Sequence, residues 1–284
     1  MASTALKTEE EKKEYFDTPE VLDEKIEKLA EMIRGSTYFC AFTGAGISTA
    51  CGIPDYRSGA ETTLATGAGC WEKAANVEKA RKDGKLLNAP ANPRAFNSTM
   101  AKAAPSKCHM AMVELMNRGL LKHVISQNLD GLHRKSGIPA DKISELHGNR
   151  NLEICQKCQR DYMRDFRVRT AQKCHDHKTG RKCEACGGDL YDSIINFGEP
   201  LNASILNRAY AEGEKCDVML SLGSSLRVMP ACGIPAETGL NPNQKHVIVN
   251  LQKTPCDDEA EFVIHGYIDQ VMEILMAKLN LPIP

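Results

Sequence analysis

The chain has 284 residues, of which 42% are hydrophobic, so it is long enough to bury a substantial core. Its 36 lysine and arginine residues balance 37 acidic residues, and the formal net charge of −1 excludes a strong overall field for a polyanionic partner. No apolar run approaches the roughly 20 residues of a membrane span, and the polar segment Met1–Lys13 lacks the apolar stretch of a signal peptide. We therefore expect a soluble intracellular protein with no membrane partner.

The first long helix is predicted after a charged leader, residues 1–15, which we expect to be solvated and disordered. Thr18 is suited to cap a helix that starts with Pro19, and Gly35 is suited to end it. Between them, apolar residues recur on one helical stripe: Leu22, Ile26, Leu29, Ala30 and Ile33. A helix over 19–35 is therefore predicted.

After this helix, short apolar runs alternate with helical patterns. The first run, Tyr38–Phe42, leads through the glycine turn Thr43–Ser48 toward another expected helix. Further runs resemble buried parallel strands: His123–Ser126, Ile143–Leu146, Ile194–Phe197, Val218–Leu222 and His246–Leu251. Apolar residues have helical spacing in His109–Asn117, Ala203–Glu212 and Tyr267–Leu279. The alternation predicts an α/β fold with a doubly wound parallel, Rossmann-like sheet.

Two stretches interrupt this alternation. Ser58–Pro105 is rich in Ala, Gly, Asn and Pro, and we interpret it as a mobile cofactor loop or insertion. Asn151–Asp192 holds several cysteines and many charges, and we interpret it as an inserted zinc-binding module. Residues 16–150 and 193–284 would then form the nucleotide-binding domain.

The cysteine spacing is typical of a metal site. Cys155-x-x-Cys158 and Cys183-x-x-Cys186 are two pairs separated by 24 residues. Four thiolates match a closed, structural zinc tetrahedron, and the alternative is four reduced cysteines without metal. A second alternative is that Cys174, His175 or His177 replaces one ligand. The other cysteines, including Cys40 and Cys216, fit core packing.

Gly44-x-Gly46 follows a predicted strand, where small residues let backbone N–H groups approach a phosphate. A tight structural turn is the alternative interpretation. The third glycine of the dehydrogenase fingerprint is replaced by Thr49, and no acidic residue ends a second strand about 20 residues further on. A hydride-transferring dehydrogenase is therefore disfavoured.

Polar residues follow the apolar runs at positions where an open parallel sheet forms its ligand crevice: Asp55, Gln127, Asn128 and Asp130. Taken singly, each could equally be a turn former. His147 comes after an apolar run and before Gly148, and histidine has a pKa close to the working pH of a general base. By spacing alone, a structural histidine is the more common interpretation.

Seven groups of residues, in order along the chain, resemble the motifs of the sirtuin family: Gly44–Ser48, Gly52–Arg57, Ser126–Gly131, Glu145–Asn149, Asn196–Glu199, Gly223–Leu226 and Asn250–Gln252. The resemblance extends from about Phe16 to the end of the sequence. Other segments are most similar to the class IV branch, which is nuclear and associated with chromatin: Gly46–Ala50, Pro105–Met110, Thr179–Arg181 and His265–Tyr267.

The resemblance implies NAD-dependent deacetylation or deacylation of protein lysines, with a structural Zn²⁺. An acyl-lysine carbonyl oxygen would attack the nicotinamide ribose of NAD, and the acyl group would pass to ADP-ribose with release of nicotinamide and free lysine. His147 would take a proton from the ribose hydroxyls, Asn128 would position ribose and water, and Asp130 would organise the nicotinamide pocket together with Asp55.

The resemblance also implies binding residues. Those for the phosphates are Gly44, Ala45, Gly46, Ser48, Thr49, Gly223, Ser224 and Ser225. Those for the ribose and nicotinamide are Tyr56, Arg57 and Gln127, with Trp71 as an aromatic contact. Those for the adenosine are Asn250, Leu251, Gln252 and Ile268. A peptide would add as a strand between two segments, Phe197, Gly198 and Glu199 on one side and Leu226, Arg227 and Val228 on the other.

Two other activities remain open, a protein mono-ADP-ribosyltransferase and a non-catalytic reader of NAD or acyl-lysine. The expected partner is an acyl-lysine protein or peptide, with histones as one class, in the nucleus or the cytoplasm. We expect weak or no intrinsic nucleic-acid binding. The basic residues best placed for it lie in the inserted module: Arg160, Arg164, Arg167, Arg169, Lys173, Lys178, Arg181 and Lys182.

Overall fold

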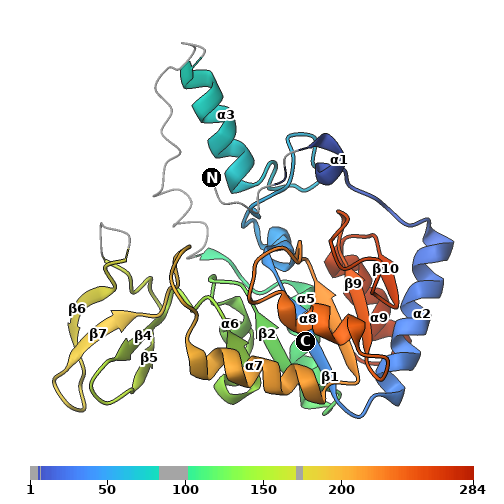
Figure 1. Ribbon diagram of the computed structural model, residues 1–284. Coiled ribbons are helices and arrows are strands. Elements are labelled where there is room, and N and C mark those ends of the chain that lie inside the picture. The colour runs from blue at the N-terminus through green and yellow to red at the C-terminus, as the bar shows by residue number, and fades with distance from the viewer. Residues whose placement is uncertain (1–5, 7, 83–101, 171–174) are drawn as a thin grey trace.

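The computed structural model describes residues 6, 8–82, 102–170 and 175–284. These residues form a large α/β domain with a smaller β-sheet module beside it (Figure 1). The predicted fold class is confirmed.

The core of the large domain is a parallel sheet of six strands within the described residues, in the order β10-β9-β8-β1-β2-β3. The strands are β1 (Phe39–Thr43), β2 (Leu121–Ser126), β3 (Ile143–Glu145), β8 (Val218–Leu222), β9 (Lys245–Val249) and β10 (Phe262–Ile264). Every neighbouring pair is parallel. The chain winds outward from β1 first in one direction and then, starting at β8, in the other. The carboxyl ends of β1 and β8 therefore flank the switch point, where open α/β sheets bind their ligands.

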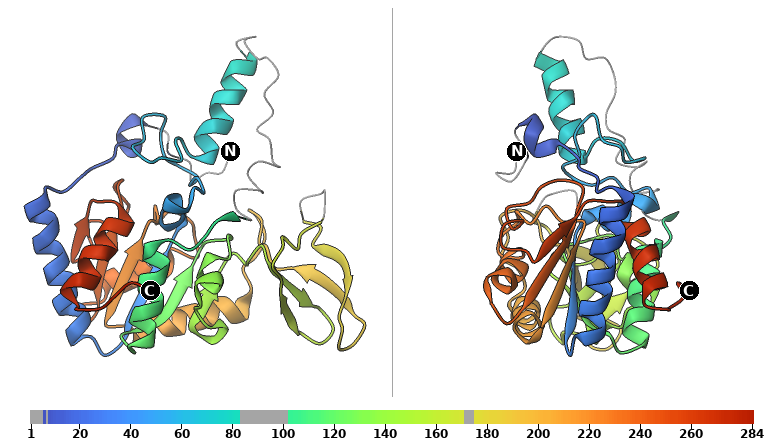
Figure 2. Two further views of the ribbon diagram at one scale, coloured as in Figure 1. Left: turned by 180° about the vertical axis from the view of Figure 1, so that it is seen from behind. Right: turned by 90° about the vertical axis from the view of Figure 1, so that its right-hand side faces the viewer.

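Helices cover both faces of this sheet, as the right-hand view of Figure 2 shows. One face is covered by α2 (Pro19–Gly35), α5 (Lys107–Asn117) and α9 (Ile268–Lys278). The other face is covered by α7 (Ala203–Lys215) and α8 (Gly233–Leu240). Each face encloses its own apolar cluster, so the strands are buried on both sides.

The predicted first helix is confirmed in its bounds and its buried stripe. The Thr18 side chain accepts a hydrogen bond from the Val21 backbone N–H, and Pro19 is the first helical residue. The buried residues of α2 are the predicted ones: Leu22, Ile26, Leu29, Ala30 and Ile33. Burial of this stripe against α9 and the sheet anchors the helix.

The smaller module is an antiparallel sheet, which within the described residues has four strands in the order β5-β4-β7-β6. The strands are β4 (Leu152–Cys155), β5 (Asp161–Met163), β6 (Lys178–Lys182) and β7 (Asp189–Asp192). They all lie inside the stretch 151–192 that breaks the α/β alternation in the sequence.

Short helical segments connect these elements: α1 (Glu9–Lys12), η1 (Ala45–Cys51), α3 (Cys70–Lys82), α6 (Leu132–Ser136) and η2 (Ala140–Lys142). The helix expected after the glycine turn is the 3₁₀ segment η1. The stretch 58–105 contains α3, and its residues 83–101 lie outside the described residues. Among the described residues, no helix has both the length and the apolar character needed to cross a membrane.

Two sequence expectations differ from the structure. Ile194–Phe197 is not a strand, because the Ile195 N–H binds the His147 carbonyl oxygen and the Asn196 N–H binds the Glu199 side chain instead of a strand ladder. The leader is not wholly a solvated tail, because α1 forms within it and Glu14 is hydrogen-bonded to Thr62 and Thr63. The strand β10 was not predicted, since its three residues are too few to show a pattern.

Candidate active site and metal centre

Two glycine turns meet at the switch point of the sheet. The Gly44 N–H donates to the Leu222 carbonyl oxygen at 2.9 Å, and the Gly46 N–H donates to the Gly223 carbonyl oxygen at 2.9 Å. A Cβ atom on Gly44 would lie 2.6 Å from the Gly223 oxygen, and one on Gly46 would lie 2.7 Å from the Gly223 Cα atom. Any larger residue would separate the turns. Both turns line the crevice at the carboxyl ends of β1 and β8, a position that suits a phosphate.

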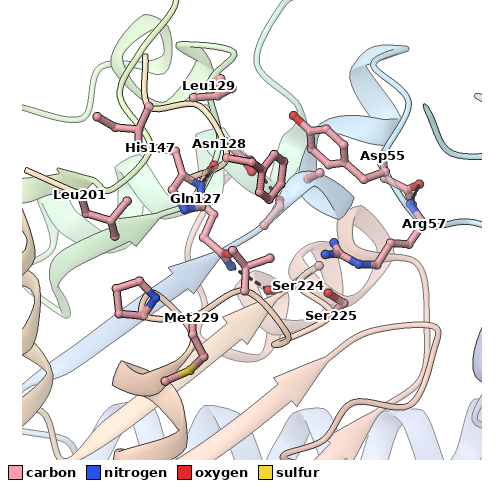
Figure 3. A pocket seen from close by; sticks show the side chains of 18 of the residues that line it. Asp55, Arg57, Gln127, Asn128, Leu129, His147, Leu201, Ser224, Ser225 and Met229 are labelled. Carbon is pink, nitrogen blue, oxygen red and sulfur yellow. Dashed lines mark hydrogen bonds between the residues drawn. The ribbon is translucent and has the colours of Figure 1, made fainter. Parts of the chain in front are cut away.

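A pocket of about 480 Å³ opens above these turns. Figure 3 shows side chains that enter it from the ends of β2 and β8, from the loop after η1 and from the loop after β3. The predicted residues that line it are Gly44, Ala45, Gly46, Asp55, Tyr56, Arg57, Trp71, Gln127, Asn128, His147, Phe197, Gly198, Glu199, Gly223, Ser224, Ser225, Val228, Asn250 and Gln252. Folding thus gathers residues that are far apart in the sequence.

His147 lies on one side of this pocket, in the loop that follows β3. Its Nδ1 atom is 3.0 Å from the Gln127 carbonyl oxygen. Burial lowers the pKa of the imidazole, and the hydrogen bond to the Gln127 carbonyl partly opposes this effect. The ring is therefore neutral at physiological pH, as a proton acceptor must be.

The loop of His147 is held by the chain entering from the small module. Gly148 has a φ of +83°, and a Cβ atom there would lie 1.9 Å from the Ser193 carbonyl oxygen. The Asn149 N–H donates to Ser193 Oγ at 3.0 Å, and the Asn149 side chain donates to Glu145 at 2.7 Å. Only glycine fits at position 148, so the turn beside the histidine is fixed.

Gln127 and Asn128 come directly after β2 and point to different partners. Gln127 Nε2 donates to Ser224 Oγ at 2.8 Å, the contact drawn as a dashed line in Figure 3. Asn128 Nδ2 donates to the Gly44 carbonyl oxygen at 3.0 Å. These bonds tie the end of β2 to the two glycine turns, and they orient both amides in the pocket.

Asp130 and Ser48 were predicted to contact the cofactor, but the structure places them behind the pocket wall. Ser48 Oγ donates to Asp130 Oδ2 at 2.7 Å, and the Leu132 N–H donates to Asp130 Oδ1 at 2.8 Å. Both residues are buried, and neither is among the residues lining the described pockets. Their bonds support the loops that carry Asn128 and the glycine turn.

The opposite side of the pocket carries a cation and aromatic rings. Asp55 accepts hydrogen bonds from the backbone N–H groups of Arg57 and Ser58 at 3.1 and 2.9 Å, so it shapes the loop. The Arg57 guanidinium lies 4.4 Å above the ring of Trp71. The Trp71 ring lies 5.8 Å from that of Phe197, which places α3 next to the loop that follows the small module.

A second pocket of about 370 Å³ adjoins the first, because the two share Gly46, Asp55, Asn250 and Gln252 as lining residues. Thr49, Leu251 and Ile268 line this second pocket. They are the remaining predicted cofactor residues apart from Ser48 and Asp130. The two pockets form an elongated site on both sides of the glycine turns, which suits a dinucleotide.

The four predicted metal ligands meet in the small module. The sulfur atoms of Cys155, Cys158, Cys183 and Cys186 all lie within 4.8 Å of one another, and the pairs 155–186 and 158–183 are 3.5 Å apart. A zinc tetrahedron with Zn–S bonds of about 2.3 Å has sulfur atoms about 3.8 Å apart. The donor set and its geometry therefore fit a structural Zn²⁺.

The two histidines considered as alternative ligands do not belong to this cluster. His175 and His177 both bond to Glu199 Oε1, at 2.5 and 2.9 Å, and His177 also bonds to Asp192 at 3.1 Å. Cys174 lies outside the described residues. The histidines instead connect the small module to the loop at the pocket.

A Sir2 family model matches residues 44–230. This chain belongs to the Sir2 family. The NAD-dependent protein deacetylase SRT1 of Arabidopsis thaliana is 43% identical to it in an alignment of 273 positions that covers 95% of this chain and 52% of that protein. The NAD-dependent protein deacetylase sirtuin-7 of Homo sapiens is 40% identical in an alignment of 283 positions that covers 95% of this chain and 64% of that protein. This Sir2 chain thus spans about half to two thirds of the length of these curated relatives.

The fold agrees with this family. A solved structure of Sir2 with a deacetylated p53 peptide and 3′-O-acetyl-ADP-ribose has a TM-score of 0.65 and 27% sequence identity, and the match covers 90% of this chain and 99% of that one. The predicted resemblance to sirtuins is confirmed.

Of the two peptide-binding segments predicted for this Sir2 chain, the first lines the pocket with all three of its residues and the second with only one. Phe197, Gly198, Glu199 and Val228 line the first pocket. Leu226 is buried in the apolar cluster under α7 and α8. Arg227 lies 3.5 Å from Glu11 in an ion pair and lines neither described pocket.

The Sir2 pocket also has an apolar wall that is not apparent in the sequence. It consists of Leu129, Ile195, Pro200, Leu201, Leu206, Met229 and Pro230. Figure 3 shows Leu201 and Met229 on the same side of the pocket as His147. Apolar residues in loops and on a helix look like core residues in a sequence, so no local pattern marks them.

Proposed function

We propose that this Sir2 chain is an NAD-dependent protein-lysine deacetylase or deacylase, which transfers the acyl group to ADP-ribose and releases nicotinamide and free lysine. One observation carries the proposal. A half-buried, neutral imidazole, His147, lines the same pocket as the two glycine turns and the apolar wall. A proton acceptor, a phosphate cradle and an apolar channel are the parts that this chemistry needs.

NAD supplies a ribose carbon that is activated by its nicotinamide leaving group. The backbone at Gly44–Gly46 and Gly223–Ser225 would hold its phosphates, because these turns face the crevice at the switch point. Arg57 would lie near the negative charge of the diphosphate, with its guanidinium fixed on the Trp71 ring. Thr49, Leu251 and Ile268 would enclose the adenosine in the second pocket.

His147 would accept a proton from a ribose hydroxyl through Nε2, since its Nδ1–H donates to the Gln127 carbonyl oxygen. Asn128 would orient the ribose or a water molecule through its Oδ1 atom, because its Nδ2 donates to the Gly44 carbonyl oxygen. Asp130 would act through the Ser48 hydroxyl and the loop after β2, without direct contact with NAD.

The apolar wall beside His147 suits the aliphatic stem and acyl chain of a modified lysine. Leu201, Leu206 and Met229 come from the loop before α7, from α7 and from the loop before α8. A protein or peptide segment would lie along Phe197–Glu199, from which the lysine side chain enters the pocket.

The test is mass spectrometry of acyl-lysine peptides incubated with the protein, with and without NAD. The panel includes histone-tail and non-histone sequences with acetyl and longer acyl groups. We expect free lysine, nicotinamide and acyl-ADP-ribose in the reactions that contain NAD. ADP-ribosylated protein with the acyl peptide intact would identify a mono-ADP-ribosyltransferase, and binding without turnover would identify a reader.

We also propose a division of the chain into a nucleotide-binding domain, residues 16–150 and 193–284, and a zinc module, residues 151–192.

The similarity to the class IV branch supports a nuclear location. Imaging of a fluorescent fusion tests this location, and even staining of the whole cell would contradict it.

We propose weak, salt-sensitive nucleic-acid binding at most. The cations of the small module largely have anionic partners, since Arg164 and Arg181 pair with Glu153, and Lys178 and Lys182 pair with Asp189. Lys173 lies outside the described residues. Fluorescence anisotropy with duplex DNA at physiological salt tests the proposal, and sub-micromolar affinity would contradict it.

A further inference from the structure

The segment Thr8–Tyr15, which we call the strap, lies against the loop 58–72 beside the cofactor pockets. It includes the short helix α1, which Figure 1 shows close to this loop and away from the sheet. The strap precedes the first long helix and is highly charged, and the sequence predicts no role for it in the fold. We therefore consider whether its contacts serve the cofactor site.

The strap binds the loop through two charged side chains. Both carboxylate oxygens of Glu14 accept hydrogen bonds, from Thr62 Oγ1 at 2.5 Å, from the Thr63 N–H at 2.9 Å and from Thr63 Oγ1 at 2.7 Å. Lys12 forms an ion pair with Glu72 at 3.0 Å, and the two side chains are only 14% and 18% exposed. This shielding distinguishes the pair from the exposed surface ion pairs that contribute little.

The same strap is attached to the sheet at the second pocket. The Tyr15 N–H donates to the Leu251 carbonyl oxygen at 2.8 Å, and Gln252 Nε2 donates to the Lys12 carbonyl oxygen at 3.1 Å. Leu251 and Gln252 both line the second pocket. The strap thus connects the loop on one side of the site to the end of β9 on the other.

The loop has little packing of its own. Residues 60–68, all of which the structure describes, include no buried side chain. Thr63, Leu64 and Ala65 nevertheless line the second pocket, and Trp71 lines the first. A segment with few buried contacts opens readily unless something outside it holds it in place.

We propose that the strap holds the loop 58–72 closed over the NAD site, with Lys12 and Glu14 as positioning residues. This inference rests on the proposed function for the identity of the ligand. Loss of either contact would leave the loop open more of the time. The apparent affinity for NAD would then fall in proportion to the fraction of molecules whose loop is closed. The chemical step, once NAD is bound, would be almost unaffected.

The test uses the fluorescence of Trp71, the single tryptophan of the chain, which lies beside Glu72 in α3. The variants are Glu14→Ala and Lys12→Ala, and the matched control is Glu24→Ala, which removes an exposed carboxylate from α2. In ligand-free protein, we expect faster acrylamide quenching of Trp71 and faster hydrogen exchange in 58–72 for both strap variants. The control should match the wild type.

Titration with ADP-ribose then measures the effect on binding. We expect a Kd about two- to fivefold higher in both strap variants, because a tenfold loss in the ratio of closed to open loop lowers the closed fraction by about that factor. In the deacylation assay the KM for NAD should rise by a similar factor, while kcat at saturating NAD changes less than about twofold. Glu14 lines the second pocket, so a weaker Kd in Glu14→Ala does not by itself separate loop closure from direct contact with the ligand. Lys12 lines neither described pocket, so its effect cannot arise from direct contact with the ligand.

Charge exchange gives the decisive control. Lys12→Glu should weaken ADP-ribose binding, and Lys12→Glu combined with Glu72→Lys should restore much of it. Unchanged quenching, exchange and Kd in Glu14→Ala and Lys12→Ala would overturn the proposal, as would equal losses in Glu24→Ala. If the wild type bound no ADP-ribose, the proposed function would fail, whereas quenching and exchange in the free protein would still decide the role of the strap.

Discussion

The Nδ1 atom of His147 lies 3.0 Å from the carbonyl oxygen of Gln127. A carbonyl oxygen can only accept a hydrogen bond, so the ring proton of the neutral imidazole is on Nδ1 and Nε2 carries the lone pair. Gln127 is itself tied to Ser224 through its side chain, at 2.8 Å. The end of β2 therefore fixes the tautomer of the histidine and contacts the turn after β8.

His147→Ala should lower kcat/KM for deacylation by roughly 100- to 10,000-fold, because it removes a positioned proton acceptor. The Kd for ADP-ribose should change little, since the phosphates and adenosine are assigned to other residues. Steady-state kinetics and calorimetric titration measure the two effects. Near-normal turnover in this variant would refute the assignment of His147 as the base.

The acid limb of the rate profile should lie below the ordinary imidazole pKa of 6.5, because burial lowers the pKa of His147. A protonated ring cannot accept a proton, so the rate falls as the pH drops through the pKa of the folded protein. Above pH 6.5 most molecules carry the neutral base. A profile of kcat/KM from pH 5 to pH 8 measures the limb, and an apparent pKa above 6.5 would contradict this account.

Glu145 should make folding stability fall between about pH 4.5 and pH 7. Burial raises the pKa of its carboxyl group from 4.5 to about 7. In this window the Glu145 carboxyl group releases its proton in the unfolded chain and retains it in the folded chain. Rising pH therefore lowers the free energy of unfolding, by at most about 3 kcal/mol.

Glu145→Gln removes this titration and keeps an oxygen to accept the bond from Asn149. The variant should match the wild type near pH 4.5 and be the more stable protein at pH 8. Urea unfolding across this range measures the difference between the two proteins, in which the contributions of the buried histidines cancel. A difference that stays constant with pH would show that the carboxyl group titrates normally.

Zinc removal should unfold the small module and leave the parallel sheet formed. The apolar cluster of the module is small, with Leu190, Cys155 and Cys183 buried in it, so the metal would supply much of its stability. We expect one zinc per chain by metal analysis, and loss of zinc in Cys155→Ser. The control is Cys256→Ser, because Cys256 is a buried cysteine outside the four-cysteine cluster. This variant should retain its zinc. A folded, active preparation without zinc would refute the structural role.

Local chemistry in the sequence was sufficient for several features of this protein. The Thr18 cap, Pro19 and the apolar stripe predicted α2 with its correct ends, because capping and helical periodicity act within a few residues. The spacing of Cys155, Cys158, Cys183 and Cys186 predicted one metal cluster, because the two cysteines of each pair are only three residues apart and form a local ligand pair. The glycine turn after β1 was also visible, because no other residue fits there.

Only the tertiary structure decided which residues line the pockets. Asp130 follows the same strand as Asn128, two positions further on, but its carboxylate turns inward to Ser48 while Asn128 lines the pocket. The apolar wall around Leu201 and Met229 comes from separate loops that meet only after the sheet has formed. The strap gains its role in the same way, because Lys12 and Glu72 are brought together by folding. Contacts between distant segments depend on how the elements pack, and a sequence pattern reports only on near neighbours.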